Sequence, residues 1–401
     1  MSAILDRLLK GREVEWVKLG NVCDLQRGRM ITAKNVNEGC IPVLSGGKQP
    51  AYYHDEYNRQ GETIVIAGSG AYAGHITYWN IPIFVGDAFS IKAKDKLVLT
   101  KYIYYFLLDN QRKIYKLQKG SGVPHVYPKD LAVFDIPIPP LDVQAEIVRI
   151  LDTFTALTAK LTAELNSREK QYQYYRDKLL NFSDMSIETD SNRQQQTALS
   201  ARIANDVKLN YEISWKKLGD IGEVRMCKRI LKNQTATSGD IPFYKIGTFG
   251  KQADAYISKS LFDEYKQKYS YPKIGEILIS ASGTIGRTVI FDGKDAYFQD
   301  SNIVWVENDE YFILNKFLFY YYQIVNWGAS EGGTINRLYN DNIRKIKIPV
   351  PPIEEQKRIV EILDKFETLT HSITEGLPKE ITLRQKQYEY YREQLLDFTK
   401  I

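Results

Sequence analysis

The chain contains a long internal duplication. Residues 169–182 read EKQYQYYRDKLLNF and residues 385–398 read QKQYEYYREQLLDF, with nine of the fourteen positions identical. An Ile-Pro-[Ile/Val]-Pro-Pro segment also occurs twice, at residues 136–140 and 348–352. The two copies of each segment lie about half the chain apart. A period this long indicates duplicated domains, because the repeats of solenoid proteins are only about 20–50 residues long. The sequence therefore predicts two copies of a domain, each followed by a similar segment.

The duplication divides the 401 residues into five parts. Two long, divergent parts are expected to be domains with cores of their own, and two shorter, similar parts are expected to be helical. A polar, Gln-rich stretch between them is interpreted as a surface linker. The predicted boundaries are residues 1–135 for the first domain, 136–182 for the first helical region, 183–207 for the linker, 208–347 for the second domain and 348–401 for the second helical region.

The two helical regions have a heptad pattern. After each Pro-Pro pair, apolar and aromatic residues recur at alternating spacings of four and three, which is typical of long helices that pack side by side. The nearest packing partner for each of these helices is the other one. Gly376 and Pro378 interrupt the second pattern and are expected to break that helix.

Each domain has the pattern of mixed α and β structure. Strands are predicted where apolar runs follow a Gly turn, and helices are predicted in two aromatic segments, for which a strand is the alternative. The predicted strands are residues 62–67, 81–85, 276–280 and 302–306, and the predicted helices are residues 101–108 and 315–322. The predicted fold class is α+β, with two pseudo-repeated mixed α/β domains separated by two long helices.

The net charge of +5 is unevenly distributed. The two divergent domains carry +5 and +4, whereas the remaining segments together carry −4. Positively charged regions are the electrostatic footprint of proteins that bind a polyanion. Because the excess is modest, it indicates a nucleic-acid partner only together with other features.

Several other classes of protein are disfavoured. The sequence has no run of about 18 apolar residues that would predict a membrane span, and its amphipathic N-terminus lacks the apolar core of a signal peptide. The cysteines Cys23, Cys40 and Cys227 form no C-x-x-C pair. A reducing cytoplasm is therefore expected, and a zinc site is not.

Catalytic signatures are also missing. The sequence has no G-x-x-x-x-G-K-[ST] phosphate loop, no H-E-x-x-H zinc motif and no G-x-S-x-G nucleophile turn. It also lacks the [DN]-P-P-[YF] motif with which amino-methyltransferases hold a flipped base. Residues 263–266 faintly resemble the end of a nuclease motif, but a solvated helix start with an i,i+3 charge pair explains them better. The chain is therefore expected to be non-catalytic and to bind no cofactor or metal of its own.

Glycine-containing loops with polar side chains recur at matched positions in the two domains. Gly lets backbone N–H groups approach phosphates, Ser and Thr hydroxyls contact phosphates, and Lys, Arg, Asn and His can read base edges. Any one of these loops could instead be an ordinary turn, so the interpretation rests on their recurrence. The DNA-binding candidates are Lys48, Tyr52, Tyr53, Ser69, Tyr72, His75, Lys119 and His125 in the first domain, and Lys245, Thr248, Ser282, Thr284, Arg287, Asn336 and Arg337 in the second.

The repeated tyrosine segments are expected to have two kinds of tyrosine. Tyr172 and Tyr175 lie on the heptad pattern, where packing between helices is the default. Tyr174 points away from that pattern and lies near Arg176, and an exposed Tyr beside Arg is a common interface anchor. The candidate partner-docking residues are Gln144, Tyr174, Arg176, Gln356, Tyr390 and Arg392.

Together these features resemble one family, the specificity (S) subunits of type I restriction-modification enzymes. The resemblance rests on the two Pro-Pro stops, the two Q-Y-x-Y-Y-R helices, IPVLSGGKQPAYY at residues 41–53, GETIVI at residues 61–66, and Gln144 after the first Pro-Pro pair. TAEL at residues 162–165 looks like the helical unit whose copy number varies in some members. The resemblance covers nearly the whole chain.

The resemblance implies that each domain is a target recognition domain for one half of a bipartite, non-palindromic site in double-stranded DNA. The helices would pack antiparallel as a coiled-coil spacer and would dock two methylation subunits, which bind S-adenosylmethionine. Restriction subunits would then join the full complex in the cytoplasm. Two alternatives remain open from the sequence: a self-sufficient DNA methyltransferase or nuclease, and a coiled-coil adaptor with no role in DNA binding.

Overall fold

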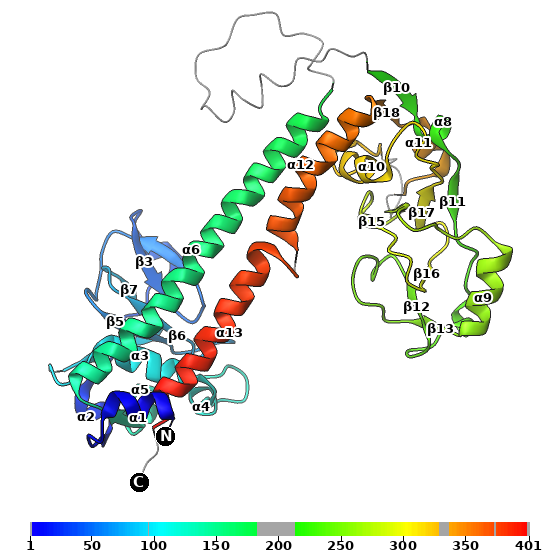
Figure 1. Cartoon of the computed structure of the whole chain (residues 1–401). Helices are drawn as coiled ribbons and strands as arrows, with labels where there is room; N and C mark the ends of the chain where they lie inside the picture. The colour runs from blue at the N-terminus through cyan, green and yellow to red at the C-terminus, as the bar shows by residue number, and fades with distance from the viewer. Residues whose placement is uncertain (1, 95, 183–212, 329–336, 373, 399–401) are drawn as a thin grey trace, which may run out of the picture. The chain divides into compact units, whose positions relative to one another are not determined.

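A computed structural model describes residues 2–94, 96–182, 213–328, 337–372 and 374–398 (Figure 1). The chain divides into two compact units. The first unit comprises Met1–Glu164 and Leu377–Ile401, and the second unit comprises Leu165–Gly376. The predicted linker, residues 183–207, lies outside the described residues. Each unit therefore combines one mixed α/β domain with parts of both helical regions.

Three small sheets form the domain of the first unit. Its strands are β1 (Glu15–Lys18), β2 (Cys23–Arg27), β3 (Ile41–Leu44), β4 (Tyr52–His54), β5 (Thr63–Ala67), β6 (Ile76–Trp79), β7 (Phe84–Val85), β8 (Ala88–Ala93) and β9 (Asp135–Ile138). The strand orders are β2-β8-β5-β6, β4-β3-β7 and β1-β9, and only β3 and β7 run parallel. β5 is buried along its whole length, as its unbroken apolar run predicts.

The second unit repeats this arrangement. Its strands are β10 (Ser214–Lys217), β11 (Val224–Met226), β12 (Ile241–Tyr244), β13 (Tyr256–Ile257), β14 (Ile277–Ser280), β15 (Thr288–Ile290), β16 (Tyr297–Phe298), β17 (Ile303–Val306) and β18 (Lys347–Val350). The strand orders are β11-β17-β14-β15, β13-β12-β16 and β10-β18, and β12 and β16 run parallel. The two domains therefore share one topology, which confirms the predicted duplication.

Short helices complete each domain. The first unit has α1 (Ala3–Leu9), α2 (Leu19–Val22), α3 (Thr100–Asp109), α4 (Gln111–Tyr115), α5 (Pro128–Ala132) and the 3₁₀ turn Ala33–Asn35. The second unit has α8 (Leu218–Ile221), α9 (Lys259–Lys268), α10 (Asn315–Tyr321), α11 (Asn340–Lys345) and the 3₁₀ turn Lys232–Gln234. The aromatic helices α3 and α10 confirm the helical interpretation of both aromatic segments. α9 is particular to the second domain, since the matching residues 55–62 of the first contain no helix.

Three long helices follow the domains. α6 (Leu141–Leu180) is continuous over 40 residues, and the second helical region forms α12 (Ile353–His371) and α13 (Gly376–Leu396). The predicted break at Gly376 is confirmed, because this glycine has a φ of +71° and a side chain there would clash with the carbonyl oxygen of Thr368.

The long helices pack antiparallel within each unit, as predicted. In the second unit, Tyr175 of α6 stacks on Phe366 of α12, and Tyr172 contacts His371 edge to face. In the first unit, Phe154 of α6 stacks on Tyr391 of α13 at a ring-centroid distance of 5.1 Å. The assignment of Tyr172 and Tyr175 to helix packing is therefore confirmed.

The C-terminal helix belongs to the same core as the N-terminal residues. Leu395 of α13 is fully buried in a cluster with Leu5 of α1 and Ile147 of α6. The Ser2 hydroxyl also donates a hydrogen bond to the backbone carbonyl of Gln394. Figure 1 accordingly shows the end of α13 beside α1.

One predicted strand is shorter than expected. The apolar run at residues 81–85 forms only the two-residue strand β7, because Ile83 pairs separately with Arg59 through an isolated bridge. The other predicted strands correspond to β5, β14 and β17.

Candidate nucleic-acid interface

Three loops of the first domain meet at His125. Backbone β-bridges join this residue to both Ser69, after β5, and Lys119, after α4. The loop after β3 joins them, because Gly46 lies so close to Ser69 that a Cβ at Gly46 would stand 2.5 Å from the Ser69 carbonyl oxygen. The fold thus gathers polar residues from three distant parts of the sequence on one loop surface.

Lys48, Tyr72 and His75 come together on this surface. The Lys48 ammonium lies 5.0 Å from the centroid of the exposed Tyr72 ring, within the range of a cation–π contact. Burial and the nearby positive charge of Lys48 lower the pKa of His75 below its ordinary value. A neutral imidazole offers one hydrogen-bond donor and one acceptor, so His75 is suited to reading a base edge.

The structure adds residues that the sequence interpretation missed. The Tyr127 ring stacks on His125 with centroids 5.9 Å apart, and the Arg27 guanidinium lies 5.4 Å from the Tyr127 centroid. Lys129 approaches the same ring at 5.9 Å. Tyr-Pro-Lys at residues 127–129 is a weak signal by itself, because Arg27 joins the group only in the folded chain. These cations concentrate positive potential beside the loop surface.

Other predicted residues of the first domain have internal contacts. The Lys119 ammonium pairs with Asp130 at 2.7 Å, and the Ser69 hydroxyl donates to Asp87. These contacts hold the loops in shape, and Lys119 keeps more than half of its side chain exposed. Tyr52 and Tyr53 lie on β4, an edge strand, with exposed rings.

The second domain has the same loop frame with different side chains. A β-bridge joins Ser282 to Arg337, as Ser69 is joined to His125 in the first domain. The Arg337 guanidinium lies 6.0 Å from the centroid of the exposed Tyr339 ring. Tyr339 follows Tyr127 by 212 residues, the spacing that also separates the two Ile-Pro-[Ile/Val]-Pro-Pro segments. An arginine here therefore replaces the histidine of the first domain on an equivalent tyrosine.

Ser282 is a correction to the sequence interpretation. Its side chain is buried and its hydroxyl donates a hydrogen bond to the Asn302 side chain at 2.8 Å, so it shapes the loop instead of facing DNA. Thr248 accepts from the Lys245 amide in a turn, and the Thr284 carbonyl accepts from the Ser280 hydroxyl.

Two predicted cations of the second domain are tied to the loops beside them. Lys245 pairs with Asp254 at 2.8 Å, and Arg287 donates from Nη1 to the carbonyl oxygen of Phe249 at 3.0 Å. Each retains further donors, so both can still contact DNA. Asn336 lies outside the described residues.

The predicted docking residues divide into two groups. Tyr174 and Tyr390 are each 55% exposed, as the prediction requires. Gln144 and Gln356 are fully buried, so the prediction that they dock a partner is wrong. The recurrence of glutamine at these two matched positions reflects a contact inside the protein and not a contact with a partner.

The arginines beside the exposed tyrosines are also largely covered. Arg392 forms an ion pair with Asp109 of α3 at 3.0 Å, and Arg176 reaches Gln323 in the second unit. The docking role of Arg176 and Arg392 stays a prediction, although both guanidinium groups turn toward the domain of their own unit.

Comparison with known proteins gives the same assignment for nearly the whole chain. The family of type I restriction modification DNA specificity domains matches residues 11–168 and 212–383. A protein of Haemophilus influenzae named as a type I restriction enzyme specificity subunit is 49% identical over 409 residues, covering 98% of each chain. The specificity subunit of an Escherichia coli type I restriction enzyme is 32% identical over 441 residues, covering 99% of this chain and 97% of the relative.

The chain belongs to the type I specificity subunits. Its two loop surfaces lie in its two DNA specificity domains, which confirms the function expected from the sequence. The alternative of a self-sufficient methyltransferase or nuclease is not favoured.

Solved structures share the fold of this specificity subunit. The S subunit of a type I restriction-modification system from M. genitalium aligns with a TM-score of 0.61, at 17% identity and 97% coverage of both chains. A chain from a structure of the type I system, described for its assembly and conformational transition, aligns with a TM-score of 0.54 at 16% identity, covering 96% of this chain and 98% of that one. These likenesses support the α+β class with two domains and long helices.

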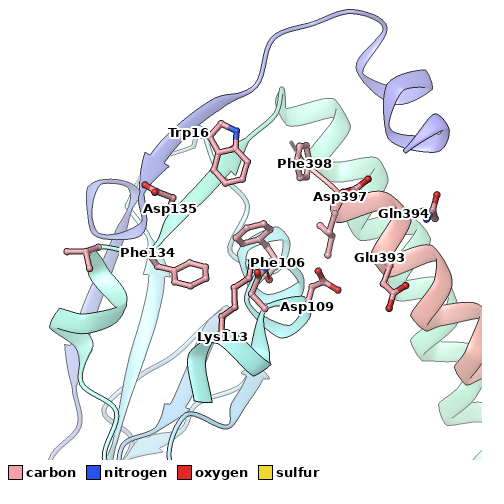
Figure 2. Close-up of a pocket in the computed structure, with 13 residues that line it drawn as sticks. Trp16, Phe106, Asp109, Lys113, Phe134, Asp135, Glu393, Gln394, Asp397 and Phe398 are labelled. Atoms are coloured by element: carbon pink, nitrogen blue, oxygen red, sulfur yellow. Dashed lines mark hydrogen bonds between the residues drawn. The ribbon is translucent and has the colours of Figure 1, made fainter. Parts of the chain in front are cut away.

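A separate cavity of about 780 Å³ lies in the first unit of the specificity subunit (Figure 2). Figure 2 shows aromatic rings and carboxylates around this space. The labelled rings belong to Trp16, Phe106, Phe134 and Phe398, and the labelled acids are Asp109, Asp135, Glu393 and Asp397. None of its lining residues is a DNA-binding candidate, so the cavity is distinct from the loop surface.

Within the described ranges of the chain, no helix is long and apolar enough to cross a membrane. The same ranges contain no group of three or more His, Cys, Asp or Glu that could hold a metal ion.

Proposed function

We propose that this specificity subunit is a non-catalytic reader of a bipartite, non-palindromic DNA site, with one half-site for each domain. The observation that supports this proposal is the repeated loop frame. The bridges Ser69–His125 and Ser282–Arg337 match, whereas the side chains on the frames differ. Two loop frames of the same geometry would approach DNA in the same way, and the different donors and acceptors on them would recognise different bases.

The loop surface of the first domain offers both kinds of contact that DNA recognition needs. Arg27 and Lys129 supply positive charge for phosphates, and Lys48, His75 and His125 supply donors and acceptors for bases. Since phosphate neutralisation releases counterions, DNA binding should weaken steeply as the salt concentration rises.

A duplicated helix face supports docking of two copies of one protein. On α13, Arg384 donates to Gln387 at 2.9 Å beside the exposed residues Lys386 and Tyr390. A shallow cavity of about 350 Å³ opens among these side chains. On α6, the matching set is Arg168, Lys170, Gln171 and Tyr174, and Arg168 again donates to the glutamine, at 3.0 Å.

Exposed side chains can vary without harming a core, so the repetition of this face suggests a shared binding role. The partner we assign is the methylation subunit, which would hold S-adenosylmethionine and transfer the methyl group. Two such subunits would bind, and restriction subunits would complete the assembly. The complex would act in the cytoplasm, where its double-stranded DNA target lies.

The helices would also act as a spacer that sets the gap between half-sites. A helix rises about 1.5 Å per residue and DNA rises about 3.4 Å per base pair. Four residues inserted after Leu165 of α6 would therefore lengthen the gap by roughly one to two base pairs and leave both half-sites unchanged.

Methyl-transfer assays and methylome sequencing test this proposal. The pure subunit, incubated with DNA and S-adenosylmethionine, should transfer no methyl group, whereas the complex with the methylation subunit should methylate one bipartite motif. Methyl transfer by the subunit alone, or a methylated motif without a gap, would refute it.

A further inference from the structure

Gln144 forms three hydrogen bonds that tie α6 to the first domain. Its Oε1 accepts from the backbone amide of Leu99, the residue that precedes α3, at 2.9 Å. Its Nε2 donates to the carbonyl oxygens of Leu97 at 3.0 Å and Pro139 at 2.8 Å. One buried amide therefore joins the start of α6 to the start of α3.

Gln356 forms the same three bonds in the second unit. Its Oε1 accepts from the amide of Leu314, which precedes α10, at 2.8 Å. Its Nε2 donates to the carbonyl oxygens of Phe312 at 2.9 Å and Pro351 at 2.8 Å. The contact is thus duplicated atom for atom between two domains whose loops have diverged.

A second contact lies eight residues further along each helix. Asp152 of α6 accepts from the Lys101 ammonium at 2.9 Å and from the Tyr105 hydroxyl at 2.6 Å. Asp364 of α12 is paired with Lys316 at 3.1 Å and accepts from the Tyr320 hydroxyl. Both donors in each unit come from the aromatic helix, α3 or α10.

The two contacts define the orientation of the aromatic helix. Eight helical residues span about 12 Å along the axis, so each aromatic helix is held at two separated points. One attachment would leave it free to pivot, whereas two fix its direction along the long helix. The aromatic helix in turn packs on the sheet of its own domain, through Tyr102 and Ile103 in the first unit.

We propose that Gln144 with Asp152, and Gln356 with Asp364, are positioning residues that hold each recognition domain at a fixed angle on its spacer helix. Through that angle they determine the gap length that the subunit accepts. This inference rests on the proposed reading of a bipartite site with a helical spacer. The residues act through the domain and touch no DNA, so their loss should relax the gap and leave the half-site sequences unchanged.

Matched tyrosine variants separate positioning from stability. Tyr105→Phe removes one hydrogen bond to Asp152 and keeps the ring, and Gln144→Leu removes the other attachment. Tyr102→Phe is the control, because its hydroxyl is also buried on α3 but donates to the Pro137 carbonyl oxygen of β9 at 2.8 Å instead of to the spacer helix. Tyr320→Phe is the corresponding change in the second unit, where the hydroxyl donates to Asp364 and to the neighbouring Glu367 of α12.

The readout is the gap of methylated sites in a host that expresses each variant with its methylation partner. In Tyr105→Phe and in Tyr320→Phe, some methylated sites should have a gap that is one base pair longer or shorter than the wild-type gap. The fraction of such sites should rise about tenfold, the change in an equilibrium constant that corresponds to the loss of one hydrogen bond to a charged acceptor. The half-site sequences should stay those of the wild type, and Tyr102→Phe should keep the wild-type gap.

Three results would overturn the inference. The first is an unchanged gap distribution in both tyrosine variants, and the second is an equal broadening in Tyr102→Phe. The third is an equal loss of methylation at every gap, which a purely structural role would produce. If the Gln144→Leu variant does not fold, the two tyrosine variants still test the inference. A wild-type complex that methylates no bipartite motif would refute the proposed function instead, so the two failures are distinguishable.

Discussion

Leu395→Ala is expected to destabilise the first unit and leave the second unchanged. Leu395 is fully buried near the C-terminus and belongs to the cluster formed by Leu5, Ile147 and Leu151. Truncation of such a leucine to alanine costs about 2–5 kcal/mol, because it loses transfer free energy and leaves a cavity. A loss of ~3 kcal/mol raises the open population of the first unit roughly a hundredfold.

Native-state hydrogen exchange can measure this loss separately in the two units. Amides of β5 should exchange roughly a hundredfold faster, whereas those of β14, in the second unit, should keep their protection. Leu383→Ala is the control, since it is the same change on the same helix at a side chain that is 45% exposed. It should cost less than about 0.5 kcal/mol.

Equal acceleration in β5 and β14 would contradict this reasoning, because it would mean that the C-terminal helix stabilises both units alike. Unchanged exchange in β5 would also refute it, since Leu395 would then not be part of the core of the first unit.

Four other substitutions test separate parts of the molecule. Arg337→Ala should lower base discrimination at the second half-site by about tenfold, and His125→Ala should do the same at the first half-site. If methylome sequencing of either variant showed a motif degenerate in both halves, the two domains would not be independent readers. Tyr390→Ala should weaken binding of the methylation subunit by about thirtyfold in titrations, without changing half-site preference. Burial raises the pKa of Glu276, so its ionisation opposes folding as pH rises past the ordinary carboxyl pKa. Glu276→Gln should therefore stabilise the second unit relative to the wild type above about pH 5 and not below about pH 4, in urea unfolding followed across that range.

Much of the fold was predictable because it depends on local patterns. The heptad pattern identified α6, and the apolar runs identified β5 and β14. These patterns report which side of an element is buried, and that information lies within a few neighbouring residues. The break at Gly376 was also predictable from neighbouring residues, because Gly376 and Pro378 interrupt the heptad pattern.

The candidate site was predictable only in part. Recurring loops located Ser69, His125 and Arg337, but not the cations that gather on Tyr127. Recurrence also led to a wrong docking role for Gln144, because a repeated residue shows a shared constraint and does not show whether its side chain is exposed.

The sequence by itself determined the duplication, the long helices, the most apolar strands of each copy and the family of the protein. The tertiary structure decided that Gln144 is an internal attachment and that Leu395 completes the core of the N-terminal domain, more than two hundred residues away in the chain. The physical reason is that periodicity specifies the face an element buries, whereas the neighbour that covers it is selected by packing over long distances in sequence.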